Sequence, residues 1–184
     1  MSRYRPLLLI IALLALPFVV AATLYLTGWR PAKAGNHGEL LDPPRPVPAL
    51  AGPHGAPLDK TSLEGHWNLI VAGAGPCDEA CRQWIVATRQ IHVALYKQMS
   101  RVQRTWLTDQ AVPDSAPLTA LQPDLHAAVA GSSAARAAFD LDAGGHRVYV
   151  VDPQGRIILR YPTDAAPRDI LKDMERLLRY AWAG

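Results

Sequence analysis

The two cysteines of this 184-residue chain, Cys77 and Cys81, stand four residues apart, shortly after an apolar run that ends at Gly73. Two thiols at this spacing form a disulfide, bind a soft metal ion such as Cu(I) as thiolates, or alternate between these states. Two ligands alone leave the metal underdetermined, so a third donor, usually an imidazole, would make such a site more specific. The state of this cysteine pair is therefore the central chemical question.

The elements around the cysteines place them at the start of a helix. The apolar run over residues 67–73 predicts a buried strand, and residues 73–76 form a turn. Mostly apolar residues then recur at the three- and four-residue spacing of one helical face: Cys81, Trp84, Ile85, Thr88, Ile91, Leu95 and Met99. The partial positive charge of a helix N-terminus favours the thiolate of Cys77, whereas Asp78 and Glu79 oppose it unless a cation is bound.

The rest of the chain continues the alternation of strands and helices. A second strand is predicted over residues 102–107, and Ser132 or Ser133 is expected to cap a short helix that ends near Phe139. Residues 146–161 predict a hairpin with an Asp-Pro-Gln-Gly turn, and a final amphipathic helix begins near Pro167. This order predicts an α/β fold with the cysteines at the carboxyl end of the first core strand, where active sites of open α/β sheets concentrate.

The N-terminus contains a candidate membrane span. Residues 7–26 are twenty consecutive uncharged, mostly apolar positions, which suffice to cross a bilayer as a helix. The alternative is a signal peptide cleaved near Ala21 and Ala22, although the segment is long for one. Arg3 and Arg5 favour a cytoplasmic N-terminus, and Arg30 and Lys33 on the far side weaken that bias. The folded part is then extracytoplasmic, or periplasmic in a bacterium.

Composition divides the chain into three expected parts. These are a membrane anchor over residues 1–28, an extended Pro/Gly-rich tether over residues 29–57, and a folded domain over residues 58–184. A hairpin near residues 51–55 is expected at the end of the tether. Beyond the anchor, 17 basic residues face 16 acidic ones, so nothing indicates a nucleic-acid partner. The sequence also lacks a Gly-rich phosphate loop and a His-Glu-x-x-His motif.

Several local strings resemble the Sco/SenC family of membrane-anchored copper chaperones. The Cys77–Cys81 spacing matches the Cys-x-x-x-Cys-Pro motif of that family, Thr108-Asp109 is similar to its strand-end aspartate, and residues 149–155 look like its Tyr-x-x-Asp-Pro-x-Gly hairpin. The resemblance implies a thioredoxin-like central sheet flanked by helices and preceded by one transmembrane helix. It further implies copper bound by two thiolates and one histidine for cytochrome c oxidase assembly.

The sequence departs from the family pattern at two positions. Arg82 replaces the proline after the second cysteine, and Gly144 stands where the family has its histidine, five residues before Tyr149. His146 lies two residues later and would share a face with Gly144 if the strand already runs there. The alternative is that His146 is an exposed residue at the strand entry. Among the other histidines, His92 is expected to be packed, His66 to open a strand, and three to lie solvated in loops: His37, His54 and His126.

Three functions remain open at this point. The first is a copper-binding assembly factor with Cys77, Cys81 and His146 as ligands and a cytochrome c oxidase subunit or another assembly factor as partner. The second is a thiol–disulfide oxidoreductase in which Cys77 attacks and Cys81 resolves the mixed disulfide. The third is a scaffold without metal or redox turnover. A purely structural disulfide is the weaker interpretation, because so small a loop stabilises little.

Overall fold

The computed structural model describes residues 4–29, 35–52, 58, 63–111, 122 and 124–180. Contacts divide the chain into two compact units, residues 1–35 and 36–184. In the first unit, helix α1 (Arg5–Leu26) has Pro17 in its interior and no buried residue. It is long and apolar enough to cross a membrane, a test that a signal sequence also passes. This helix supports single-pass membrane anchoring.

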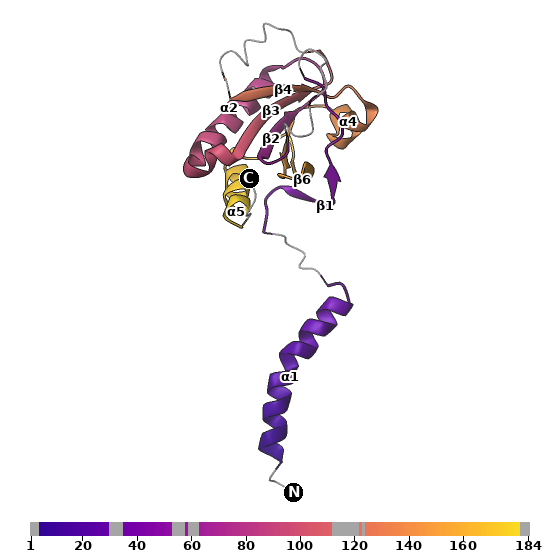
Figure 1. Cartoon of the computed structure of the whole chain (residues 1–184), viewed down its shortest axis with the longest axis vertical. Helices are drawn as coiled ribbons and strands as arrows, with labels where there is room; N and C mark the ends of the chain where they lie inside the picture. Colours follow the sequence, from indigo (N-terminus) through magenta and orange to yellow (C-terminus); the bar gives the residue numbers. More distant parts are fainter. Residues whose placement is uncertain are drawn as a thin grey trace. The chain divides into compact units, whose positions relative to one another are not determined.

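The second unit is built on a mixed six-stranded sheet of order β1-β6-β5-β2-β3-β4 (Figure 1). Strands β2, β3 and β4 run parallel to one another, and the other neighbours are antiparallel. The strands are β1 (Glu39–Pro46), β2 (Trp67–Ala72), β3 (Val102–Thr108), β4 (Leu125–Val129), β5 (Arg147–Val151) and β6 (Arg156–Tyr161).

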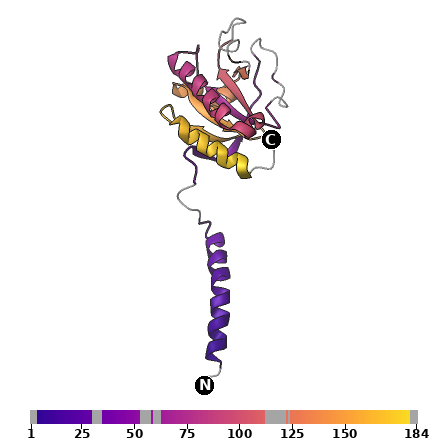
Figure 2. The ribbon, with the colours of Figure 1, turned by 90° about the vertical axis from the view of Figure 1, so that its left-hand side faces the viewer.

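Helices cover both faces of the sheet. Helix α2 (Glu79–Ala94) and helix α5 (Pro167–Tyr180) lie side by side on one face, as Figures 1 and 2 show. The short helix α4 (Ser133–Ala138), capped by Ser132 as predicted, lies on the other face. The described residues also contain two 3₁₀ helices, η2 (Tyr96–Arg101) after α2 and η3 (Leu141–Ala143) after α4. Helices on both faces of a central sheet confirm the predicted α/β architecture.

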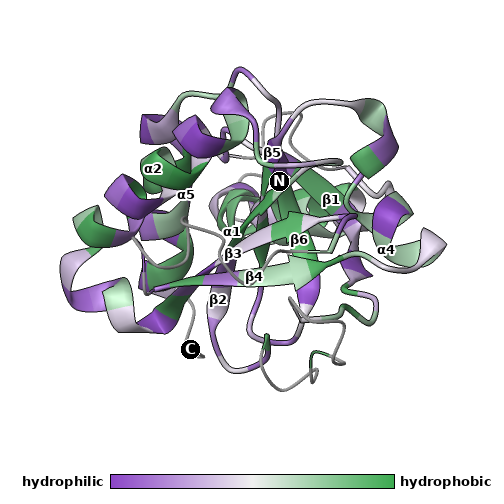
Figure 3. Cartoon of the chain, turned by 90° about the horizontal axis from the view of Figure 1, so that it is seen from above, coloured by the Kyte–Doolittle hydropathy of each residue, from purple (hydrophilic) through white to green (hydrophobic). Residues whose placement is uncertain are grey.

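Strand β2 shows how the two cores form. Successive side chains of a strand point to opposite faces. Leu69 and Val71 accordingly pack in the core beneath α2 and α5, whereas Ile70 and Ala72 belong to the core beneath α4. All six residues of β2 are buried, so this strand is the centre of the fold. The helices that cover the sheet are amphipathic; helix α2 in Figure 3, for example, carries both hydrophobic and hydrophilic residues.

Two strands differ from the sequence-based expectation. Strand β1 lies within the stretch 29–57 that was expected to be a tether, and it pairs with β6 through Leu40 and Arg45 despite its prolines. Strand β4 went unpredicted because its alanine-rich sequence carries little β propensity. His126 therefore lies on a strand rather than in a loop, although its side chain is exposed as expected. The expected hairpin near 51–55 and His54 fall largely outside the described residues; Ala51, which is described, forms an isolated bridge to Val129.

A buried carboxylate fastens the beginning of this unit to its last helix. Asp173 of α5 accepts hydrogen bonds from the backbone N–H groups of His37 and Gly38, at 2.8 and 2.9 Å, and from the Tyr161 hydroxyl at 2.8 Å. Burial would raise the pKa of this carboxyl, but these hydrogen bonds outweigh burial and lower it. His37 is exposed in a loop, as predicted, and its ring also lies 2.9 Å from Asp173.

Candidate functional site

The cysteine turn begins helix α2. Cys77 and Cys81 form a disulfide with their Cα atoms 5.1 Å apart. Asp78 is the N-cap, and its Oδ1 accepts a hydrogen bond of 2.8 Å from the Cys81 N–H. Cys81 is fully buried against Ile85 and Trp106, whereas Cys77 is partly exposed. One sulfur is thus accessible and the other sheltered, which suits a pair in which one thiol meets a partner first.

The loop before Cys77 is held by the end of strand β3. Gly75 donates its N–H to Asp109 Oδ1 at 2.7 Å, and its carbonyl accepts from the Thr108 hydroxyl at 2.7 Å. The hydrogen bond from Gly75, followed by that from Arg136, lowers the pKa of the Asp109 carboxyl, so Asp109 is anionic near neutral pH. The Thr108-Asp109 pair noted in the sequence therefore fixes the backbone two residues ahead of the first cysteine.

Strand register brings His146 to the same end of the sheet. Ala72 pairs with Arg147 and Val71 with Val148 in the antiparallel β2–β5 ladder, so the next pair in register is Gly73 with His146. His146 and Val148 are two residues apart and point to the same face, which is the face that α2 covers. His146 thereby faces the N-terminus of α2, and its Nδ1 lies 3.4 Å from Asp78 Oδ1.

The reason that His146 reaches this position differs from the one expected. Gly144 and Gly145 have φ values of +71° and +70°, so they form a left-handed turn and not the beginning of the strand. The turn delivers His146 directly to the first position before β5. The alternative of an exposed strand-entry residue is also wrong, because only 4% of His146 is exposed.

The His146 imidazole is buried without satisfying its polar atoms. Neither Nδ1 nor Nε2 has a hydrogen-bond partner among the described residues, and the Asp78 carboxylate is only within ion-pair distance. Burial lowers the pKa of the imidazole and the nearby Asp78 charge opposes this effect. Leaving a buried polar group unpaired costs about 1–3 kcal/mol, so an unpartnered histidine calls for a functional explanation.

Gly73 makes the space that this imidazole occupies. A Cβ atom on Gly73 would lie 2.5 Å from Nε2 and 2.8 Å from Cγ of the His146 ring, closer than real Cβ contacts come. Any side chain at position 73 would therefore displace the ring. Sequence reasoning treated Gly73 only as part of a turn, since its partner across the sheet could not be known before the register was.

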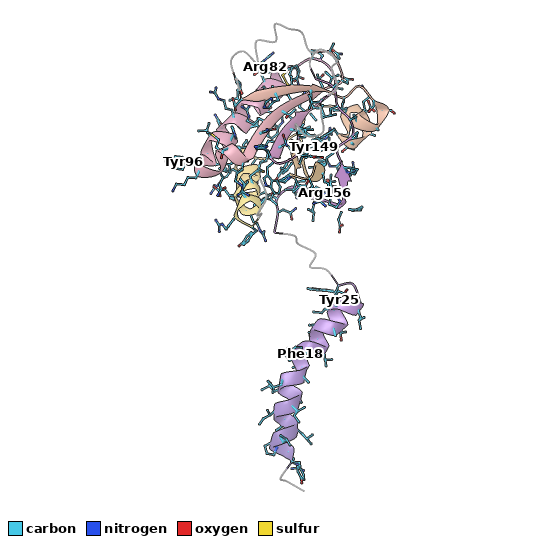
Figure 4. All side chains as sticks on the ribbon, in the orientation of Figure 1. Phe18, Tyr25, Arg82, Tyr96, Tyr149 and Arg156 are labelled. Carbon is cyan, nitrogen blue, oxygen red and sulfur yellow. A yellow bond between two sulfur atoms is a disulfide. The ribbon has the colours of Figure 1, made fainter. Side chains whose placement is uncertain are left out.

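Arg82, which stands where the Sco/SenC motif has proline, also takes part in the cysteine turn. Its Nη1 donates to the carbonyl oxygen of Cys77 at 3.3 Å, and its Nη2 pairs with Glu79 at 2.9 Å. Figure 4 shows Arg82 at the cysteine end of the domain. The guanidinium offsets part of the negative charge that Asp78 and Glu79 place beside the sulfurs.

The donors present are compatible with a soft metal ion only after reduction. Among the described residues, no three His, Cys, Asp or Glu side chains form a group that would hold a metal, and both sulfurs are tied in the disulfide. Reduction would release two thiolates, and His146 offers an imidazole whose nitrogens are unengaged. Two thiolates and an imidazole are the donor set that Cu(I) prefers. The residues present therefore fit the ion.

The other histidines that the structure describes take no part in this site. His92 is packed as predicted and lies in the last turn of α2, and Trp84 is a buried core residue. His66 precedes β2, at the end of the strand away from the cysteines, and His37 binds Asp173. Only His146 lies beside the cysteine turn among the histidines that the structure describes.

Known proteins of the same fold include copper and disulfide proteins. The apo Sco1 protein from Thermus thermophilus superposes with a TM-score of 0.61 at 22% identity, covering 80% of this chain and 99% of that one. Yeast Sco1 with copper bound gives 0.59 at 14% identity, covering 82% and 96%. A thiol:disulfide interchange protein from Bacteroides sp. gives 0.51 at 14%, covering 76% and 91%.

At these identities the similarity confirms the thioredoxin-like fold, and with it the structural resemblance to Sco proteins. No curated protein sequence matches the chain. Residues 67–181 match the family described as transmembrane-like, thioredoxin-like, C-terminal domain. The match runs from strand β2 to the end of helix α5 and includes the cysteine turn and His146. The chain therefore belongs to this family of thioredoxin-like domains.

Proposed function

We propose that this chain is a membrane-anchored, extracytoplasmic Sco-like factor that carries copper for cytochrome c oxidase assembly. Copper is its cargo, bound after reduction of the Cys77–Cys81 disulfide by both thiolates and by His146. The partner is a cytochrome c oxidase subunit or another assembly factor. The observation that carries the proposal is the buried His146 beside the cysteine turn, whose two ring nitrogens lack hydrogen bonds to any residue that the structure describes.

The surroundings of His146 suit a ligand that is held in readiness. Metal-binding histidines usually direct their second nitrogen to a carboxylate, which fixes the tautomer. Asp78 is such a carboxylate, and its Oδ1 lies 3.4 Å from Nδ1 of the ring. A bound cation would also offset the charge of Asp78 and the two thiolates, while Arg82 already balances Glu79. The local charges therefore favour the copper-loaded state.

The membrane arrangement belongs to the same proposal. Helix α1 anchors the chain with its N-terminus in the cytoplasm, so the thioredoxin-like domain lies outside, in the periplasm of a bacterium. Thiols in that compartment are oxidised unless a reductant or a metal protects them. Copper loading would thus depend on a reductant that opens the Cys77–Cys81 disulfide.

The second candidate is thiol–disulfide exchange with a client protein, and the disulfide itself favours it. Cys77 is partly exposed ahead of the N-cap, where a thiolate is stabilised. In the reduced protein, the Cys77 thiolate attacks a client disulfide, forms a mixed disulfide and releases one client thiolate. The Cys81 thiolate then attacks Cys77, restores the intramolecular disulfide and releases the second client thiolate. The third candidate, a scaffold, needs neither step.

Copper titration separates the three candidates. The full-length reduced protein in detergent, titrated against a chromophoric Cu(I) chelator, is expected to bind one Cu(I). His146→Ala should lower the affinity by about tenfold or more, whereas His126→Ala, which removes an exposed histidine from β4, should not. Absence of Cu(I) binding by the reduced protein would reject the copper proposal.

The alternatives have their own signatures. If Cys81→Ser protein traps a client through Cys77 while no copper binds, exchange is the function. If protein with both cysteines changed to serine still supports oxidase assembly in cells, the scaffold explanation is the correct one.

A further inference from the structure

We propose that Arg136 is a positioning residue that fixes the cysteine turn and His146 relative to each other. The proposal rests on the proposed function, because the two parts need a fixed separation only if they share a ligand. Arg136 lies on helix α4, across the sheet from α2, and touches neither cysteine nor His146. It acts through two carboxylates, one on each side of the site.

The first arm reaches the cysteine turn through Asp109. Asp109 uses both oxygens: Oδ1 accepts from the Gly75 N–H at 2.7 Å, and Oδ2 pairs with Nη1 of Arg136. Only 15% of the Asp109 side chain is exposed, against 35% of the Arg136 side chain, so the carboxylate end of this ion pair is the more shielded from water. Because Gly75 lies two residues before Cys77, the position of Arg136 sets the position of the backbone that leads into the cysteine turn.

The second arm reaches His146 through Asp142. Nη2 of Arg136 pairs with Asp142 Oδ1 in the 3₁₀ helix η3, four residues before His146. The segment between them contains the left-handed turn of Gly144 and Gly145. Glycines there lack side chains that would fix the turn by packing, so an anchor at Asp142 restricts where His146 enters the site.

One guanidinium therefore joins two segments that are far apart in sequence. Arginine suits this task because its planar fork presents separate N–H groups to two carboxylates, which a single ammonium does not. Helix α4 is a firm base for it: Ser132 caps the helix by accepting a 3.1 Å hydrogen bond from the N–H of Ala135, a residue that is fully buried. The pairing with Asp109 and then Asp142 raises the pKa of Arg136, so its charge persists.

Removing the bridge should uncouple His146 from the thiolates without removing any ligand. Arg136→Ala should lower the Cu(I) affinity by about tenfold, the usual effect of losing a residue that orients a ligand. The same change in a His146→Ala background should have little further effect. Arg136→Lys should recover only part of the loss, since lysine engages one carboxylate. Arg156→Ala is the matched control, because Arg156 also pairs with a carboxylate but lies at the opposite end of the strands (Figure 4).

A copper-independent measurement keeps this inference separate from the proposed function. In NMR spectra of the full-length oxidised protein in detergent micelles, Arg136→Ala should shift both the Gly75 amide and the His146 ring resonances. Arg156→Ala should shift neither. If the wild-type protein binds no Cu(I), the proposed function fails while these spectra still test the bridge.

Two results would overturn the inference. One is a His146 ring resonance that stays in place while the Gly75 amide resonance shifts, because Arg136 would then position only the cysteine turn. The other is an equal loss of Cu(I) affinity from Arg136→Ala with and without His146, because the bridge would then not act through that ligand.

Discussion

His92 and His146, the two histidines that are buried in the described part of the domain, differ in how their ring nitrogens are used. His92 is at the end of helix α2, and its Nε2 donates to the carbonyl oxygens of Met99 and Val102 at 3.0 and 2.8 Å. Its Nδ1 lies 3.3 Å from Asp124. His146 is at least as buried, yet neither of its nitrogens has a hydrogen bond in the described part of the chain.

The neighbourhood of His92 is a nearly closed polar network. Arg104 is fully buried, and its guanidinium donates to Asp124, Gln122 and the Ile85 carbonyl oxygen. Its Nε has no hydrogen-bond partner among the described residues. These bonds tie β3 to α2 and to the segment before β4. A network of this kind stabilises the fold and offers no group to a ligand.

The difference indicates which end of the domain is structural and which is functional. Buried polar groups without hydrogen-bond partners are rare in folded proteins, since each costs about 1–3 kcal/mol. His92 avoids that cost and His146 bears it beside the cysteine turn. The same residue type, equally hidden from water, therefore stabilises one end of helix α2 and lies unpaired at the other end, where we propose the functional site.

The largest expected effect is from breaking the network around His92. Arg104→Met should lower the free energy of unfolding by about 3 kcal/mol, because Asp124 and Gln122 lose their buried partner. Urea unfolding of the full-length protein in detergent would measure it. Lys172→Met removes an exposed ion pair with Asp169 and should cost less than about 1 kcal/mol. Equal losses in the two variants would contradict the structural role of the network.

A smaller effect is expected at Asp173, another buried and fully partnered group. Asp173→Asn should lower the free energy of unfolding by about 1–3 kcal/mol near neutral pH, since the amide replaces the charged acceptor of three hydrogen bonds. The pKa of this carboxyl is lowered in the folded protein, so its contribution is present above the unfolded pKa of about 3.9 and is lost as the pH falls through the folded value.

The pH dependence provides the check on Asp173. Stability measured between about pH 6 and about pH 3 should fall less in the Asp173→Asn variant than in the wild type. An identical decline in both proteins would show that this carboxyl does not account for the acid sensitivity.

The smallest effect is expected at His146, and it sharpens the comparison most. His146→Leu should change the free energy of unfolding by less than about 1 kcal/mol or raise it, because an apolar side chain removes two unpaired polar atoms. His92→Leu should lower it by about 1–3 kcal/mol, since the carbonyl oxygens of Met99 and Val102 lose their donor. Thermal or urea unfolding of both variants gives the measurement. A larger loss from His146→Leu would assign His146 to structure.

Local patterns in the sequence predicted the central elements well. The apolar runs at residues 67–73 and 102–107, the Asp-Pro-Gln-Gly turn and the apolar stripes of the helices correspond to described elements. The exception is Met99, which was expected on the face of the helix after the cysteines but lies exposed in η2, because α2 ends at Ala94. Their signals are local, since periodicity and turn chemistry are properties of a few adjacent residues. Strands β1 and β4 were not predicted, because proline and alanine are poor strand formers. Pairing with a neighbouring strand overrides that preference in the folded protein.

The site was predictable only where its signal was local. The cysteine pair and its place before a helix could be inferred, and His146 was a candidate by its spacing. Its burial against Gly73 depends on the β2–β5 register, which no short segment of sequence specifies. The role of Arg136 could not be predicted from the sequence. It depends on contacts with two aspartates that only the folded structure brings close to this arginine.

Strand β1 has a consequence for how the protein resists association with itself. It covers β6, and without it the Arg156–Tyr161 backbone would be an open sheet edge able to pair with another chain. Pro43, Pro44 and Pro46 lack N–H groups, so the outer side of β1 is a poor template for a further strand. A soluble fragment that begins at residue 58 would lose this cover and tend to aggregate, whereas one that begins at Asn36 would keep its own protected edge.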